Sequence, residues 1–160
     1  MILHLSGDVD YEMFDELVKA FNSLIVGDSL HIYFTCPMGG NADVNEAIID
    51  FINKNKDHIG MTFYGELFSS GMIIFLSVKC NKCILPFTRG MYHFSWQEMN
   101  ISETGKPSSE YDIFSMKEMK KSKDKSINFL KTTKLSEKEI NLIKKGKDVY
   151  FSYERMLELI

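Results

Sequence analysis

Two glycine-containing turns of the sequence carry residue types that could catalyse acyl transfer. Gly39-Gly40 follows an apolar run and precedes an amphipathic segment, and Ser69-Ser70 stands between Gly65 and Gly71 in a second turn of this kind. Glycine lets backbone N–H groups approach a substrate closely. A serine at a helix N-terminus can act as a nucleophile whose oxyanion the helix amides stabilise, and the common alternative role is that of a polar N-cap.

A serine nucleophile needs a general base, because a hydroxyl is a weak nucleophile at neutral pH. The chain has four histidines. His4 and His31 lie within segments that predict strands, which favours packed or edge positions, and His58 lies in a polar turn. His93 ends the strand expected after the serine turn, so it is the histidine that we expect at the same rim of the sheet.

Apolar periodicity predicts strands and helices that alternate along the chain. The predicted strands lie at 2–5, 30–35, 59–64, 83–85, 91–94 and 148–151, and residues 65–71 are predicted to form a turn. Three of the predicted helices cover about 10–24, 72–78 and 111–131. Three more are predicted to begin at a capping box of Asp43 and Glu46, at Ser136 and at Ser152. This order predicts an α/β fold with a mainly parallel sheet and right-handed crossovers, while the polar residues 97–109 predict a loop.

Length, charge and composition narrow the class of protein. The chain has 160 residues, which suits one domain, and its net charge of −3 argues against a dedicated nucleic-acid binder. No basic stretch followed by an apolar one opens the sequence, and the apolar run 71–78 is far shorter than the roughly 20 residues of a membrane span. Three cysteines suit a reducing compartment. We therefore expect a cytoplasmic single domain over residues 1–160.

Five segments, taken in order, are similar to one known family. They are ILHLSGDV (2–9), IYFTCPMGGNADVNEAI (32–48), GELFSSGMIIFL (65–76), LPFTRGMYHFS (85–95) and KDVYFSYE (147–154). Together they resemble the opening strand, the Ser-Pro-Gly-Gly turn, the nucleophile turn, the histidine segment and the aspartate segment of the proteolytic subunit of the Clp protease. The resemblance spans nearly the whole chain and implies a ClpP/crotonase-type β-α-β superhelix with a protruding helical arm at about 110–134.

The resemblance also implies the roles of individual residues in a serine-type endopeptidase that cleaves unfolded proteins or short peptides. Ser69 matches the nucleophile, His93 the general base and Asp148 the acid that orients it, with Asp124 and Glu137 as alternative acids. The N–H groups of Gly40 and Ser70 match the oxyanion hole, and Gly39 and Phe68 are expected beside the substrate. No cofactor or metal is implied.

The family assembles into rings, so the resemblance implies a ring-like homo-oligomer. Its contacts on the arm would include apolar residues at positions Ile113, Phe114, Met116, Ile127 and Leu130, whereas the seven lysines between 117 and 134 are expected on a solvated helix face. An AAA+ unfoldase partner is less expected, because the chain begins directly at the first core strand.

Departures from the family pattern keep two other functions open. Pro37-Met38 replaces Ser-Pro, and Leu67-Phe68 replaces two alanines before the serine. These changes suit a catalytically silent scaffold or modulatory subunit, and a crotonase-like acyl-CoA enzyme would use the same pair of amides. The CxxC of Cys80 and Cys83 lacks the further ligands of a zinc site, so it predicts a turn and a strand with Cys83 buried.

Overall fold

The computed structural model describes residues 1–93 and 110–160, apart from the side chains at 110–116, 118, 119 and 122. The chain divides into two compact units. The first unit holds Met1–Tyr92 and Asp148–Ile160, and the second holds His93–Lys147.

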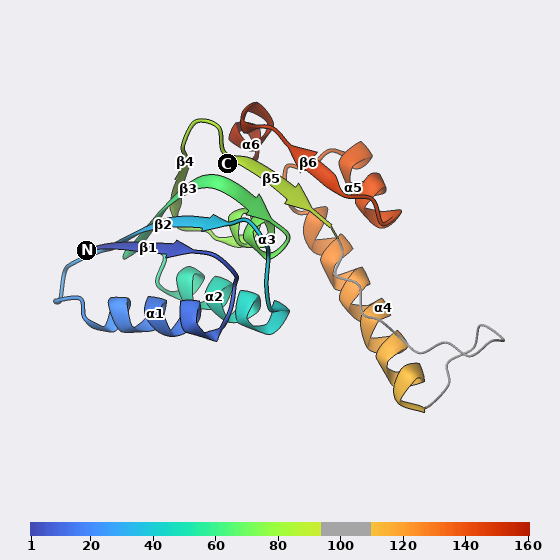
Figure 1. Cartoon of the computed structure of the whole chain (residues 1–160), viewed down its shortest axis with the longest axis horizontal. Coiled ribbons are helices and arrows are strands. Elements are labelled where there is room, and N and C mark those ends of the chain that lie inside the picture. Colours follow the sequence, from blue (N-terminus) through green and yellow to red (C-terminus); the bar gives the residue numbers. More distant parts are fainter. Residues whose placement is uncertain (94–109) are drawn as a thin grey trace. The chain divides into compact units, whose positions relative to one another are not determined.

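The first unit is built on a six-stranded, mostly parallel sheet (Figure 1). Its order is β1 (Ile2–Ser6), β2 (Leu30–Cys36), β3 (Ile59–Phe68), β5 (Arg89–Tyr92) and β6 (Val149–Phe151). A further strand, β4 (Asn81–Ile84), pairs with the first half of β3, whereas β5 pairs with its second half. All pairs are parallel except β5 with β6. The predicted α/β class with a mainly parallel sheet is confirmed.

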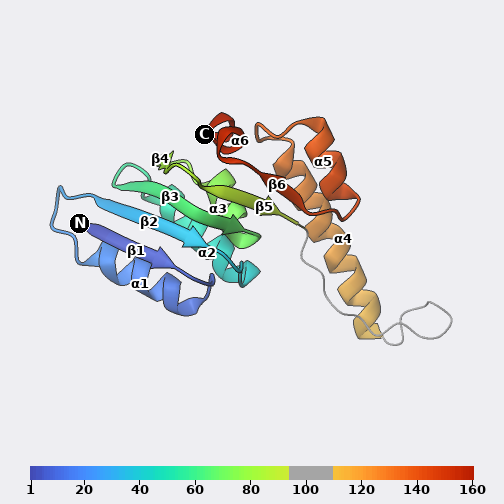
Figure 2. The same cartoon turned by 45° about the horizontal axis from the view of Figure 1, so that its top comes forward.

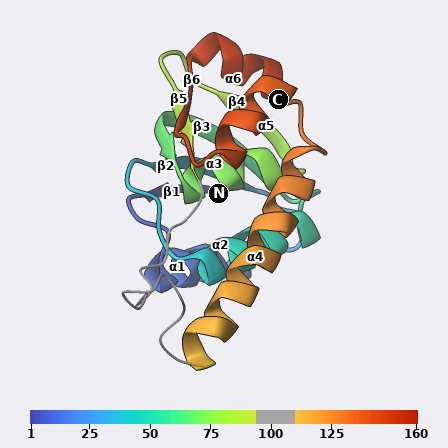
Figure 3. The same ribbon diagram turned by 90° about the vertical axis from the view of Figure 1, so that its right-hand side faces the viewer.

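Three helices lie against one face of strands β1–β3. They are α1 (Tyr11–Asn22), α2 (Ala42–Lys54) and α3 (Ser70–Ser77), with α1 and α2 side by side (Figures 1, 2 and 3). Alternate residues of β2 are buried towards this layer, from Leu30 to Cys36. Because α3 is apolar all round, it is buried on most of its surface. The core is continued by edge-to-face contacts of Phe63 with Phe34 and Phe75.

Side-chain caps fix where the helices start. The Asp10 carboxylate accepts from the Met13 N–H at 2.8 Å, which confirms the predicted start of α1. The predicted capping box at Asp43 is wrong. Asn41 caps α2 instead, because its Oδ1 accepts from the N–H groups of Asp43 at 2.8 Å and of Val44 at 3.3 Å. Asp43 therefore already lies in the first turn of the helix.

The strand β3 is longer than predicted. The sequence predicted a strand over 59–64 and a turn over 65–71, but β3 continues to Phe68. Gly65 takes a positive φ of 65°, and the register against β2 shifts between Phe34 and Cys36. This irregularity lets Leu67 pair with Cys36 on one side and with Gly90 on the other. Ser69 is therefore the single residue between β3 and α3.

The C-terminal segment of the first unit ends in α6 (Tyr153–Leu159), which packs on β5. Ser152 caps it, as predicted, by accepting from the Arg155 N–H at 3.3 Å. Met156 of α6 and Met72 of α3 both close on Gly90, where a Cβ would meet their sulfurs at 3.2 and 2.6 Å. A glycine is therefore required in β5 for both helices to pack.

The second unit contains α4 (Glu110–Leu130) and α5 (Glu137–Lys144). The predicted capping box of Ser136 and Glu139 is confirmed. Leu130 is fully buried and Ile127 half-buried, so Leu130 is not available as the predicted contact between subunits. All seven lysines between 117 and 134 are exposed, in keeping with a solvated helix face. No described helix is long and apolar enough to cross a membrane.

Several predictions fall on residues that the structure leaves out. The loop predicted at 97–109 and the last residue of the strand predicted at 91–94 lie outside the described residues. The side chains of Ile113, Phe114 and Met116 lie outside them as well.

Candidate active site

Ser69 occupies the junction between β3 and α3 in a strained backbone conformation. Its φ is 50° and its ψ is −110°, a combination that costs a non-glycine residue about 1–3 kcal/mol. Two hydrogen bonds hold it there: its N–H donates to the Met91 carbonyl of β5 at 2.9 Å, and its carbonyl accepts from the Ile73 N–H at 3.1 Å. A serine on a sharp, strained strand-to-helix turn is the arrangement that exposes a nucleophilic hydroxyl.

The Gly39 turn at the end of β2 lies directly against Ser69. A Cβ added at Gly39 would stand 2.9 Å from the Ser69 Cβ and 3.3 Å from its Oγ. Gly39 also has a φ of +97°, which side chains rarely adopt. The structure thus brings together the two glycine turns that the sequence singled out, and only glycine leaves room for the Ser69 side chain.

Gly40 is held between Val9, in the segment that follows β1, and Ser70 at the start of α3. Its neighbours fix it on one side, where the Val9 N–H donates to the Gly39 carbonyl and the Asn41 N–H donates to the Val9 carbonyl, both at 2.8 Å. On the other side the buried Ser70 hydroxyl donates to the Gly40 carbonyl at 3.2 Å. A Cβ on Gly40 would collide with the Val9 backbone, so glycine is required here too.

Two backbone N–H groups, one from each of the two turns, have no acceptor among the described residues. Within the part of the chain that the structure describes, neither the Gly40 N–H nor the Ser70 N–H donates to a protein group. The Ser70 N–H is one of the first amides of α3, which a helix leaves unsatisfied at its N-terminus. Amides of this kind, on either side of a nucleophile, can stabilise a developing negative charge.

Cys36 anchors the Gly39 turn from beneath, a role that the sequence reasoning missed. Its thiol donates to the Gly39 carbonyl at 3.1 Å, and Gly71 of α3 packs so closely that a Cβ there would lie 2.7 Å from the Cys36 Cβ. Burial raises the pKa of the Cys36 thiol, so the residue stays protonated and inert. The register shift at this residue has no signal in the sequence.

Leu67 and Phe68, the two bulky residues before Ser69, differ in burial. Leu67 is fully buried in the sheet between Cys36 and Gly90, and Phe68 is half-buried beside the serine. The Phe68 carbonyl lies 3.8 Å from the position of a Gly39 Cβ. Leu67 is therefore accommodated on the core side, whereas Phe68 remains partly accessible next to Ser69.

The expected base and acid occupy different units. Asp148 is exposed and directly precedes β6 in the first unit. His93 is half-buried, directly follows β5 and is the first residue of the second unit. The first unit by itself therefore brings together Ser69, Ser70 and the Gly39-Gly40 turn.

The side chains of His4 and His31 have partners within the sheet. His4 stacks on Tyr33 with ring centroids 5.0 Å apart, and His31 Nε2 lies 2.8 Å from the Thr62 hydroxyl. The prediction of a buried Cys83 is wrong: Cys83 is exposed with its sulfur 3.2 Å from that hydroxyl, and Cys80 is the buried member. Residues of β4 alternate across the sheet, which turns Cys83 to the face opposite the helices. Among the described residues, no group of three potential ligands could hold a metal ion.

Comparison with protein-family models gave no match to this chain, and comparison with curated proteins gave none either.

Proposed function

We propose that the chain is a serine peptidase of the Clp-protease proteolytic-subunit type, with Ser69 as its nucleophile. The observation that carries the proposal is the strained Ser69 turn, φ 50° and ψ −110°, at the start of a buried helix and in contact with Gly39. Backbone strain of this kind persists only where the surrounding structure enforces it, and it gathers at functional sites. A serine that merely capped the helix would take the extended conformation seen at Ser136 and Ser152.

The absence of a capping bond at Ser69 supports the same role. Ser136 and Ser152 each accept a hydrogen bond from the first turn of their helix, whereas the Ser69 side chain makes no such bond. Its hydroxyl is therefore not occupied by its own helix. The N–H groups of Gly40 and Ser70, which have no acceptor among the described residues, would serve as the oxyanion hole.

The assignment of His93 and Asp148 rests on the sequence resemblance and on the order of residues along β5 and β6. The last antiparallel pair of these strands is Tyr92 with Val149. His93 directly follows β5 in the sequence, and Asp148 directly precedes β6. Strand β5 is also the strand whose Met91 carbonyl accepts the Ser69 N–H. These relations favour a Ser69–His93–Asp148 triad.

In the proposed reaction, Ser69 Oγ attacks a peptide carbonyl while His93 takes its proton. The carbonyl oxygen becomes an oxyanion that the two amides stabilise. His93 then gives the proton to the leaving amine. In the second half of the reaction, water attacks the acyl group while His93 takes its proton, and His93 returns a proton to Ser69 Oγ as the acid product leaves. Asp148 holds the imidazole orientation and stabilises its cation. Substrates would be unfolded proteins or short peptides, lying along Gly39 and Phe68, and the active form would be a ring-like homo-oligomer.

Peptide hydrolysis by the assembled protein tests this proposal. Wild type and variants are compared on a fluorogenic peptide and on an unfolded protein, after size-exclusion chromatography with light scattering has defined the oligomer. We expect Ser69→Ala to lower the rate by about 10³-fold or more, and Asp148→Asn to lower it by on the order of 10²–10⁴. Hydrolysis that persists in Ser69→Ala would contradict the proposal. A folded, assembled wild type without hydrolysis would favour the scaffold function.

A further inference from the structure

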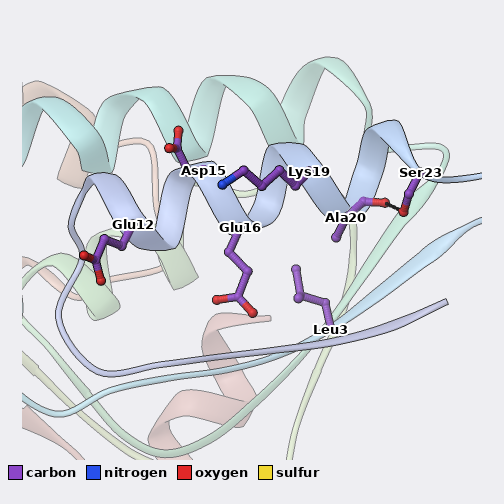
Figure 4. Close-up of a pocket in the computed structure, with 7 residues that line it drawn as sticks. All are labelled: Leu3, Glu12, Asp15, Glu16, Lys19, Ala20 and Ser23. Atoms are coloured by element: carbon purple, nitrogen blue, oxygen red, sulfur yellow. Dashed lines mark hydrogen bonds between the residues drawn. The ribbon is translucent and has the colours of Figure 1, made fainter.

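The free edge of the sheet at β1 borders a groove that has no part in the proposed active site. Strand β1 ends the strand order and pairs only with β2 among the described residues. Between it and α1 lies a cavity of about 670 Å³ lined by one apolar strand residue and six residues of α1 and its C-cap: Leu3, Glu12, Asp15, Glu16, Lys19, Ala20 and Ser23 (Figure 4). Glu16 and Leu3 extend into it from opposite walls.

The register of β1 shows which backbone groups are open along this edge. Ile2 pairs with His31, and the His31 N–H donates to the Met1 carbonyl at 2.9 Å. In a parallel ladder with this hydrogen-bonding pattern, the backbone N–H and carbonyl groups of Leu3 and Leu5 point towards β2. The N–H and carbonyl groups of Ile2, His4 and Ser6 therefore point away from the sheet. An extended peptide could form hydrogen bonds with them as an added strand.

The charge of the groove indicates what kind of strand would fit. Its wall on α1 carries the carboxylates of Glu12, Asp15 and Glu16 against the single ammonium of Lys19. An added strand would run past this wall, so basic side chains on one face of the strand would meet opposite charge. Exposed apolar side chains stand at Ile2 on β1, 65% exposed, and at Ile25 in the loop after α1, 77% exposed.

We propose that the β1 edge and the α1 groove form a docking site for an extended, lysine- or arginine-containing peptide segment that adds to the sheet beside β1. Backbone hydrogen bonds supply the register, and the carboxylates of α1 select basic side chains. The site is separate from Ser69 and would capture a basic stretch of a partner or substrate whether or not the chain cleaves it.

Fluorescence anisotropy with a fluorescein-labelled peptide of alternating lysine and valine tests the site, and the matching glutamate–valine peptide is the control. The measurements use the full chain carrying Ser69→Ala, so that cleavage cannot intervene. We expect the lysine peptide to bind and the glutamate peptide to bind at least about tenfold more weakly. Added salt should weaken the binding of the lysine peptide, because exposed charges are screened.

Two pairs of variants separate the contributions of charge and of backbone. Glu12→Lys with Glu16→Lys reverses the wall, and Asp50→Lys with Asp57→Lys makes the same charge change outside the groove; only the first pair should weaken binding by about tenfold or more. His4→Pro removes an N–H that points outward and makes no bond to β2, so the strand should persist, whereas His4→Ala keeps that N–H. We expect loss of binding in His4→Pro and retention in His4→Ala.

Three results would overturn the proposal. The first is equal binding of the two peptides by the chain carrying Ser69→Ala alone, or no binding at all. The second is unchanged binding after reversal of the Glu12 and Glu16 charges. The third is equal binding by His4→Pro and His4→Ala, both checked for folding by circular dichroism; if the proline variant unfolds, the charge-reversal pairs decide.

Discussion

Substitution of Gly39 by alanine tests the contact that shapes the candidate active site. A Cβ there would lie 2.9 Å from the Ser69 Cβ, whereas carbon atoms pack best at about 3.5–4.0 Å. The two carbons must therefore separate by about 0.6–1.1 Å. A displacement of about 1 Å at a nucleophile costs on the order of 10²-fold in rate. We expect Gly39→Ala to react with a fluorophosphonate serine probe on the order of 10²-fold more slowly than wild type.

Gly27 supplies a matched control for this substitution. It has the same φ of +97° as Gly39, but a Cβ on Gly27 would meet nothing within 4 Å. Both alanine variants should lose about 1–2 kcal/mol of unfolding free energy from the backbone conformation, measured by urea denaturation. Only Gly39→Ala should lose labelling. Wild-type labelling in Gly39→Ala, or equal loss of labelling in Gly27→Ala, would refute the argument that this contact positions the serine.

Three further substitutions or conditions probe the surroundings of the site. Ser70→Ala removes the 3.2 Å bond to the Gly40 carbonyl and should cost about 1 kcal/mol in urea denaturation, while labelling persists because the oxyanion N–H is retained; complete loss of labelling would contradict this. Burial raises the pKa of the Cys36 thiol above its ordinary value of 9.0, so the folded state binds this proton more tightly and its stability should fall as pH rises above about 9. Cys36→Ala has no thiol at this position, so in thermal scans its melting temperature should fall less above about pH 9 than that of the wild type. Phe87→Asn should raise the melting temperature by an amount worth about 0.5–1 kcal/mol, because Phe87 is 91% exposed and has a φ of 68°, which asparagine tolerates better; a lower melting temperature would contradict this.

The elements of the fold could largely be predicted from the sequence because local chemistry determines them. Asp10, Ser136 and Ser152 cap their helices as their positions indicate, and the β-branched and aromatic run at 30–35 predicts a strand, which β2 confirms. The Asp43 prediction failed because a capping pattern can be satisfied by either of two nearby polar residues. Asn41 stands next to the turn and reaches both first-turn amides.

Features that depend on neighbouring strands could not be predicted. Gly65 indicated a turn, yet β3 continues to Phe68 because its second half pairs with both β2 and β5. The positive φ of Ser69 and the support of Gly39 by the Cys36 thiol arise only when α3 packs on the end of β2. Spacing singled out the glycine turns and the serine, but their contact is a property of the folded sheet.

Localisation of a covalent fluorophosphonate adduct by mass spectrometry would show whether Ser69 is an activated nucleophile. The assembled wild type, Ser69→Ala, Ser70→Ala and His93→Ala are compared after folding has been verified. We expect one adduct, on Ser69, which is absent in Ser69→Ala, strongly reduced in His93→Ala and retained in Ser70→Ala. An adduct on another residue, or none on the assembled and folded wild type, would contradict it.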